Sequence, residues 1–147
     1  MSSIMVTGGA GYIGSHLCMA LIEKGYKVYA IDSFINSKEK IFNLINSKYN
    51  GCPILYLKSD IRNLKKIEDI FKLAKSHGTP IKSVIHLAGL KSVSESFENP
   101  IKYWDFNVLG SINLFKVMEK FNCKNIVFSS SATVYGNEYN YPIKEEF

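Results

Sequence analysis

Thr7-Gly8-Gly9-Ala10-Gly11-Tyr12-Ile13-Gly14 is the most informative segment of this chain for its fold. It follows a short apolar run at residues 4–7 and precedes residues 12–24, where apolar side chains recur at helical spacing. Glycines at positions 8, 11 and 14 allow a tight turn, close approach of a pyrophosphate to the backbone, and close packing of helix on strand. The helix N-terminus adds free N–H groups and a positive dipole end. The stretch therefore predicts a phosphate-binding loop in a strand–loop–helix unit.

Strand-like and helix-like segments alternate along the rest of the chain. Further strands are expected at residues 27–32, 54–58, 83–87 and 125–130, and further helices at 38–49, 64–76 and 100–121. The strands are almost continuously apolar, which is typical of a parallel sheet covered on both faces. We predict an α/β fold: a doubly wound, Rossmann-like parallel sheet of five strands in one domain over residues 1–147.

Composition narrows the classes of function. The 147 residues carry a net charge of +5, but Arg62 is the only arginine and the lysines are scattered, which argues against a nucleic-acid surface. Neither a membrane-spanning segment nor a signal sequence is visible, so we expect a cytoplasmic protein with no membrane partner. The three cysteines lack metal-site spacing, and we expect buried, reduced thiols and no metal. His16, His77 and His86 show no triad pattern and are expected to be core or surface residues.

Two aspartates lie at the ends of predicted strands, one as a last residue and one just beyond. Asp32 closes the strand at 27–32, where a carboxylate accepts both hydroxyls of an adenosine ribose and repels a 2′-phosphate, so NAD is favoured over NADP. Asp60 follows the strand at 54–58. It fits a contact with the adenine edge, with Ile61 offering a backbone N–H and an apolar wall, or it caps the helix that begins near Leu64.

Five motifs together resemble the extended short-chain dehydrogenase/reductase superfamily and, within it, the UDP-glucose 4-epimerase family. They are TGGAGYIG at 7–14, DSFINS at 32–37, SDI at 59–61, HLAGLKSVSES at 86–96 and VFSSSATVYG at 127–136. Nucleotide-sugar dehydratases of this superfamily carry an acidic pair after the serine or threonine that follows strand five. Here Ala132 and Thr133 follow Ser131, so the resemblance favours an epimerase.

The resemblance implies roles for individual residues. Ser131 is implied as the catalytic serine that hydrogen-bonds the reacting hydroxyl of a UDP-hexose. The implied NAD-binding residues are Gly8, Gly11, Tyr12, Ile13, Gly14, Asp32, Ser33, Asn36, Ser37, Asp60, Ile61, Leu87, Ala88, Gly89, Lys91 and Asn107. Phe106 stands where the epimerase pattern often has a second asparagine. The implied reaction interconverts UDP-glucose and UDP-galactose through a 4-keto intermediate, with hydride passing to NAD⁺ and back.

The base of this family is a Tyr-x-x-x-Lys pair, and no tyrosine of the chain has a lysine four positions later. We therefore expect the chain to be the N-terminal NAD-binding part of a longer enzyme, without the UDP-sugar region and inactive on its own. The strand at 125–130 should then present an open sheet edge.

Two alternatives stay open: another nucleotide-sugar enzyme of the superfamily, and a non-catalytic NAD-binding module. The helix at 100–121, with Trp104 and Phe115, provides either a homodimer face or part of the core.

Overall fold

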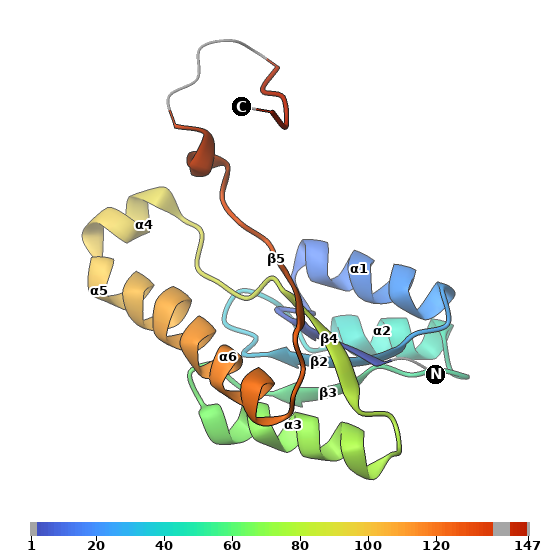
Figure 1. Cartoon of the computed structure of the whole chain (residues 1–147). Coiled ribbons are helices and arrows are strands. Elements are labelled where there is room, and N and C mark those ends of the chain that lie inside the picture. The colour runs from blue at the N-terminus through green and yellow to red at the C-terminus, as the bar shows by residue number, and fades with distance from the viewer. Residues whose placement is uncertain (1–2, 137–141, 147) are drawn as a thin grey trace.

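A computed structural model describes residues 3–136 and 142–146 of the chain. Its centre is a parallel sheet of five strands: β1 (Ser3–Thr7), β2 (Lys27–Asp32), β3 (Leu55–Lys58), β4 (Ile81–His86) and β5 (Asn125–Phe128) (Figure 1). The strand order is β3-β2-β1-β4-β5, so the chain runs one way from β1 to β3 and the other way from β4 to β5. The predicted doubly wound α/β fold is confirmed.

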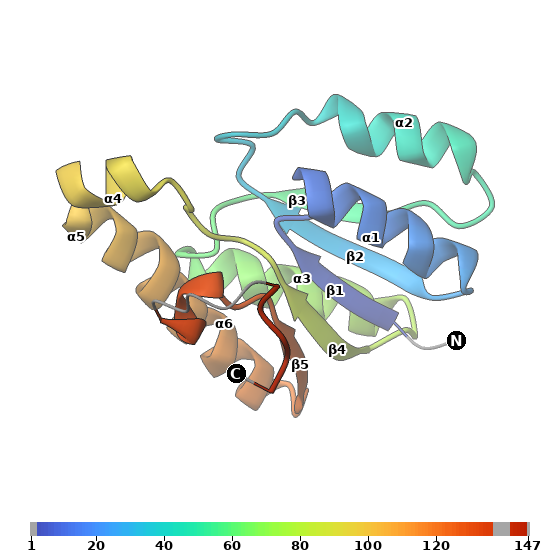
Figure 2. The same cartoon turned by 90° about the horizontal axis from the view of Figure 1, so that it is seen from above.

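Helices cover both faces of this sheet. α1 (Tyr12–Glu23) and α2 (Lys40–Lys48) lie on one face, and α3 (Leu64–Ser76) and α6 (Gly110–Lys120) lie on the other (Figure 2). Because neighbouring residues of a strand face opposite sides, Met5 packs in the core with α3 and α6, while Val6 packs in the core with α1 and α2. Both side chains are fully buried, which explains the continuous apolar character of β1.

The direction of winding changes between β1 and β4. Thr7, the last residue of β1, pairs in register with Ile31 of β2 on one side and with His86 of β4 on the other. In doubly wound sheets, ligands bind in the crevice outside the carboxyl ends of the strands at this switch point. The glycine stretch begins at that position.

The segment after β4 differs from the prediction. Instead of one helix over 100–121, the structure has α5 (Pro100–Tyr103), a π-helical segment η1 (Trp104–Leu109) and then α6. Two short helices had no periodic apolar signal and were not predicted: α4 (Val93–Glu98) and the 3₁₀ helix η2 (Ala132–Tyr135). Pro100 begins α5, as its missing N–H favours.

The apolar side predicted for residues 100–121 is mostly exposed. Trp104, Ile112 and Phe115 are 64%, 41% and 45% exposed, respectively. The buried face of α6 is formed by other residues, namely Gly110, Asn113, Leu114, Val117 and Met118. For Trp104 and Phe115 the structure thus excludes the core alternative within this chain.

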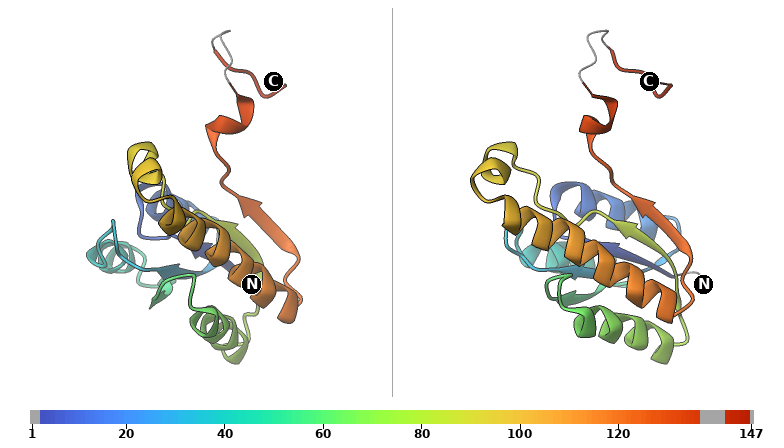
Figure 3. Two further views of the ribbon diagram at one scale, coloured as in Figure 1. Left: turned by 90° about the vertical axis from the view of Figure 1, so that its left-hand side faces the viewer. Right: turned by 60° about the vertical axis from the view of Figure 1, so that its left-hand side comes forward.

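β5 forms one edge of the sheet in both views of Figure 3, with β4 as its partner among the described strands. Ile126, Val127 and Phe128 are 38%, 63% and 53% exposed. The expected open edge is confirmed for the described residues. The prediction of buried cysteines is right for Cys18 and Cys123 but wrong for Cys52, which is half-buried.

Candidate functional site

The glycine loop between β1 and α1 leaves no room for side chains at two of its positions. Gly8 has φ +68°, and a Cβ there would lie 2.9 Å from the backbone nitrogen of Ala88. A Cβ on Gly14 would lie 2.2 Å from the carbonyl oxygen of Gly8. Gly11 is less crowded, with 3.3 Å to the same oxygen. The loop therefore folds tightly on itself and against the start of the β4–α4 connection.

The N-terminus of α1 is free of side-chain caps. Its N-cap residue is Gly11, which has no side chain to accept from the first-turn N–H groups, whereas the side chain of Asn63 caps α3 by accepting from the Lys66 N–H at 3.2 Å. Tyr12 and Ile13 of α1 are 81% and 62% exposed beside this end. The first-turn N–H groups are thus available to an anion such as a pyrophosphate.

Asp32 joins the glycine loop to the β2–α2 connection. Its buried carboxylate accepts hydrogen bonds from the N–H of Ala10 at 2.9 Å, from the N–H of Phe34 at 2.8 Å and from the Ser37 hydroxyl at 2.9 Å. A carboxylate accepts about four hydrogen bonds, so one position is left for a ribose hydroxyl, whereas the sequence predicted that the carboxylate accepts both hydroxyls. Of the other predicted residues in this connection, Ser33 is half-buried and Asn36 is exposed.

Phe34 gives the β2–α2 connection its shape. It has φ +57°, a left-handed conformation that costs free energy in a residue with a bulky side chain. Its ring packs edge-on against Phe42 at 6.0 Å and Tyr56 at 6.3 Å between centroids, and these contacts help to offset the strain. No pattern in the sequence indicated this conformation.

Asp60 pairs with Arg62 and does not cap a helix. Its two carboxylate oxygens accept from the Arg62 backbone N–H at 2.8 Å and from Nη2 at 2.8 Å, while Asn63 provides the α3 cap. The cap alternative is therefore wrong, and the adenine contact stays a prediction. Burial by itself would raise the pKa of the Asp60 carboxyl, but the hydrogen bonds from Arg62 outweigh it and lower that pKa.

Arg62 holds a cluster that sequence reasoning missed. Besides Asp60 it pairs with Asp105, and its guanidinium lies 3.5 Å from the centroid of the Phe106 ring. The hydrogen bonds to Asp60 and then to Asp105 raise the pKa of Arg62 further above its ordinary value. The side chain of Ile61 is buried in the core, where it fills the space left by Gly110. The sequence held one signal for this cluster: Arg62 is the only arginine of the chain, and a lone arginine is available to pair with carboxylates such as those of Asp60 and Asp105.

The connection after β4 is held from two sides. The Thr7 hydroxyl oxygen accepts from the N–H groups of Leu87 and Ala88, both at 3.1 Å. Asn107 of η1 accepts from the Leu90 N–H at 2.8 Å and donates to the Leu90 carbonyl at 2.9 Å. Gly89 and Lys91 are exposed. Asn107 therefore braces this connection, and a contact of its amide with a cofactor stays a prediction.

Ser131 precedes the 3₁₀ helix η2 on the segment that follows β5. Its hydroxyl lies 2.8 Å from the Thr133 hydroxyl and accepts from the Thr133 N–H at 3.3 Å. It is exposed, and these two hydrogen bonds connect it to Thr133 and not to the glycine loop. Its role toward a sugar hydroxyl stays a prediction.

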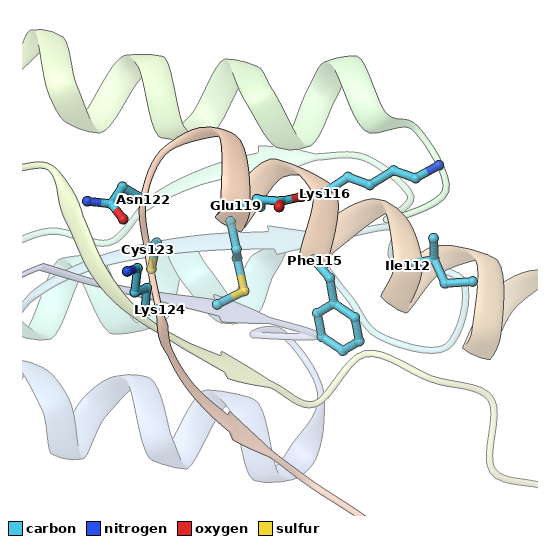
Figure 4. Close-up of a pocket in the computed structure, with 8 residues that line it drawn as sticks. Ile112, Phe115, Lys116, Glu119, Asn122, Cys123 and Lys124 are labelled. Atoms are coloured by element: carbon cyan, nitrogen blue, oxygen red, sulfur yellow. The ribbon is translucent and has the colours of Figure 1, made fainter.

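Two hollows in the described part of the chain lie away from the glycine loop. One, of about 590 Å³, is lined by the end of α6 and the residues that lead to β5, among them Phe115, Met118 and Cys123 (Figure 4). The other, of about 540 Å³, lies beside Asp60, Arg62 and Asp105. The glycine loop itself borders neither hollow, so the chemistry and not the hollow volume identifies the site. In the described ranges, no group of three or more His, Cys, Asp or Glu residues is arranged to hold a metal ion, and no helix is long and apolar enough to cross a membrane.

Comparison with known proteins gives consistent matches. The family described as GDP-mannose 4,6 dehydratase matches residues 5–147. A UDP-glucose 4-epimerase of Yersinia pestis is 45% identical over 98% of this chain and 41% of its own length. One of Klebsiella pneumoniae is 42% identical over 97% of this chain and 98% of its own length. The crystal structure of UDP-glucose 4-epimerase from Bifidobacterium longum with NAD⁺ and UDP has a TM-score of 0.87 and 40% identity, over 99% of this chain and 42% of that one.

The parallel sheet, the glycine loop at its switch point and the aspartate at the end of β2 define the class of Rossmann-like dinucleotide-binding folds. The chain belongs to the family described as GDP-mannose 4,6 dehydratase and, within it, to the UDP-glucose 4-epimerase family. It spans about two-fifths of the length of most of the curated relatives it matches.

Proposed function

We propose that this chain is the NAD-binding part of a UDP-glucose 4-epimerase, which interconverts UDP-glucose and UDP-galactose. The observation that carries the proposal is the glycine loop, in which Gly8 and Gly14 leave no space for a Cβ and the N–H of Ala10 is tied to the Asp32 carboxylate. When bound, NAD supplies a reversible hydride acceptor for C4 of the sugar. The protein's residues bind and orient the reactants and manage the proton.

The geometry supports the proposed binding roles. The uncapped first turn of α1, with Tyr12 and Ile13, suits the pyrophosphate, and the last acceptor position of Asp32 suits a ribose hydroxyl. A 2′-phosphate would meet the Asp32 carboxylate with no free arginine to compensate, because Arg62 is already neutralised by Asp60 and Asp105. The geometry thus supports NAD over NADP.

The activity is proposed for a protein that carries this chain together with the further length found in its relatives. Ser131 is the residue of this chain that would hydrogen-bond the C4 hydroxyl of the UDP-hexose. A serine hydroxyl is too weakly acidic to act as the base, and the 147 residues hold no Tyr-x-x-x-Lys pair. We expect no turnover of UDP-galactose by this chain alone.

Calorimetric titration of the purified chain with NAD⁺ and with NADP⁺ tests the cofactor proposal. We expect NAD⁺ to bind and NADP⁺ to bind at least about tenfold more weakly, since a carboxylate facing a phosphate costs upwards of about 1.4 kcal/mol. Asp32→Ala should abolish this discrimination, whereas Asp69→Ala, at a half-buried aspartate of α3 that pairs with Lys66, should keep it. Lack of NAD⁺ binding by the wild-type chain, or equal affinity for the two dinucleotides, would refute the proposal.

The homodimer and the cytoplasmic location belong to the same proposal. The exposed face formed by Ile101, Trp104, Ile112 and Phe115 supports self-association through residues 100–121. Sedimentation velocity should show a dimer that Phe115→Lys dissociates. Phe97→Lys is the matched control, because Phe97 is also exposed but lies outside this segment. A wild-type monomer at high concentration would contradict the dimer.

A further inference from the structure

A chain of hydrogen bonds runs through the interior from the end of β1 to the π-helical segment η1. The Thr7 hydroxyl lies 2.6 Å from Nδ1 of His86, and Nε2 of His86 lies 3.0 Å from the Ser111 hydroxyl. The Ser111 hydroxyl donates in turn to the backbone carbonyl of Asn107. Thr7 is fully buried and His86 is 2% exposed, so water does not compete for the bond between them, whereas Ser111 is half-buried.

The donors and acceptors allow one arrangement of hydrogens. The oxygen of the Thr7 hydroxyl already accepts two hydrogen bonds, from the N–H groups of Leu87 and Ala88. Since a hydroxyl has two lone pairs and one hydrogen, its hydrogen must go to His86 Nδ1. His86 Nδ1 is therefore an acceptor, and the ring is neutral with its hydrogen on Nε2.

The hydrogen bonds at Ser111, the other end of this hydrogen-bond chain, agree with the same tautomer of His86. The hydrogen of the Ser111 hydroxyl is used toward the Asn107 carbonyl, so its oxygen is left to accept from Nε2–H of His86. The ring's further contact is the Phe128 ring at 5.3 Å, and burial lowers the pKa of His86 to about 4. None of these neighbours carries a charge that would favour the imidazolium.

The two ends of this hydrogen-bond chain hold the same stretch of backbone, residues 87–90. Thr7 holds Leu87 and Ala88, and Asn107, whose carbonyl bonds to Ser111, holds both polar groups of Leu90 with its side chain. The π-helical turn at Trp104–Leu109 is the local feature that carries Asn107, and such turns often occur at functional sites.

We propose that His86 is a positioning residue: as the neutral Nε2–H tautomer it links the end of β1 to η1 and thereby fixes the backbone of residues 87–90 for the cofactor. The inference rests on the proposed function in so far as residues 87–90 line the NAD site. It assigns no chemical step to His86 itself. The hydrogen bonds from Thr7 through His86 to Ser111 are expected in the protein before any ligand binds, so they can be tested without NAD.

Nitrogen-15 NMR of the histidine rings at neutral pH tests the tautomer without any cofactor. We expect His86 to show a protonated Nε2 and an unprotonated Nδ1. A protonated Nδ1, or an imidazolium, would overturn the inference. This measurement is independent of whether the chain binds NAD.

Variants test the positioning role. Ser111→Ala removes the link between His86 and Asn107 but leaves the ring in place, and we expect the Leu90 amide to exchange its hydrogen about tenfold faster while a core amide such as that of Tyr29 is unchanged. Ser76→Ala is the matched control, because the Ser76 hydroxyl also donates to a carbonyl one turn back, that of Leu73 at 2.8 Å. Ser76 is the last residue of α3 and has no hydrogen bond in common with His86, Asn107 or Leu90. Unchanged exchange at Leu90 in Ser111→Ala would refute the role.

The cofactor part has its own readout. In Ser111→Ala the dissociation constant for NAD⁺ should rise about fivefold, the effect of one typical hydrogen bond. Thr7→Val should weaken binding, and Thr7→Ser, which keeps the hydroxyl, should restore it. If wild-type and Ser111→Ala chains bind NAD⁺ equally, the positioning inference fails and the proposed function stands. If the wild-type chain does not bind NAD⁺, the proposed function fails instead.

Discussion

Acidification should destabilise this protein through His86 in a pH range where few other groups respond. Burial lowers the pKa of His86 from 6.5 to about 4. In the unfolded chain the ring binds a proton below its ordinary pKa, whereas in the folded chain it stays neutral until about pH 4. The unfolded state therefore binds more protons between these values, and the free energy of unfolding falls as the pH falls from 6.5 toward 4.

The size of the effect follows from the shift. One pKa unit corresponds to about 1.4 kcal/mol, so the full shift corresponds to roughly 3 kcal/mol, most of which is lost by about pH 4.5. Carboxylates with lowered pKa, such as Asp60, also contribute, but their stabilisation is lost only as the pH falls below their ordinary values of 3.8 to 4.5. The loss above about pH 5 should thus belong mainly to His86.

Urea denaturation at about pH 7 and about pH 4.5, followed by circular dichroism, measures this loss; with a slope of about 2 kcal/mol/M the midpoint should fall by roughly 1 M or more. His86→Asn keeps an acceptor for Thr7 but does not titrate, so the difference between wild type and variant isolates the contribution of His86. Direct NMR titration of the His86 ring in the wild type covers the case in which the variant does not fold. A folded-state pKa near 6.5, or an equal pH response in the foldable variant, would refute the reasoning.

Three further predictions concern packing and charge. Gly14→Ala should lower the free energy of unfolding by about 2 kcal/mol, because its Cβ would lie 2.2 Å from the Gly8 carbonyl oxygen. Gly11→Ala, whose Cβ would lie 3.3 Å from the same oxygen, should lower it by under about 1 kcal/mol. Urea denaturation measures both, and equal costs would contradict the geometry. Arg62→Lys should lower the free energy of unfolding by about 1 kcal/mol, since one ammonium cannot bridge two carboxylates and also stack on Phe106. This loss should shrink in about 1 M NaCl, and a loss that does not depend on salt would argue against the ion pairs. Phe71→Ala should cost about 3–5 kcal/mol and Phe97→Ala under about 0.5 kcal/mol, measured by thermal and urea unfolding, because Phe71 is 2% and Phe97 is 83% exposed; similar costs would contradict the assigned core.

The sequence predicted the regular part of the fold closely. The strand at 27–32 and the helix at 64–76 agree with β2 and α3 to the residue. Both segments have a strong apolar pattern with clear ends, and α3 also has Asn63 as its cap. Periodicity is a local property, so it is most reliable where burial follows it along one uninterrupted element.

The same reasoning failed where burial did not follow hydrophobicity. α4 carries Val93 and Phe97, both exposed, and has no buried face from which a helical period could be read. On α6 the apolar side with Ile112 and Phe115 faces outward, while the buried Asn113 donates to the Arg62 carbonyl at 2.8 Å. A helical pattern shows that one face differs from another but does not show which neighbour each face meets.

The site was predicted as a set of separate motifs, and the contacts that join them were not. Asp32 binds the N–H of Ala10 across 22 positions, and Thr7 binds the His86 ring across 79. These partners meet because β1 pairs in register with β2 on one side and with β4 on the other. Strand order and register depend on the whole sheet, so no local pattern in the sequence contains them.

The stretch 7–14 therefore does more than turn around a phosphate. Thr7 holds the backbone after β4, Gly8 packs against Ala88 so closely that a Cβ would lie 2.9 Å from its nitrogen, and Ala10 holds the carboxylate at the end of β2. The resemblance to the epimerase family predicts that Asp32 holds the adenosine half of NAD and that Leu87 and Ala88 lie toward its nicotinamide half, and both groups are thus bonded to one short segment. A displacement of this segment must disturb both halves of the site together. A variant such as Gly14→Ala should therefore lower the affinity for adenosine monophosphate and for the whole dinucleotide alike, whereas Ser111→Ala should lower only the affinity for the dinucleotide.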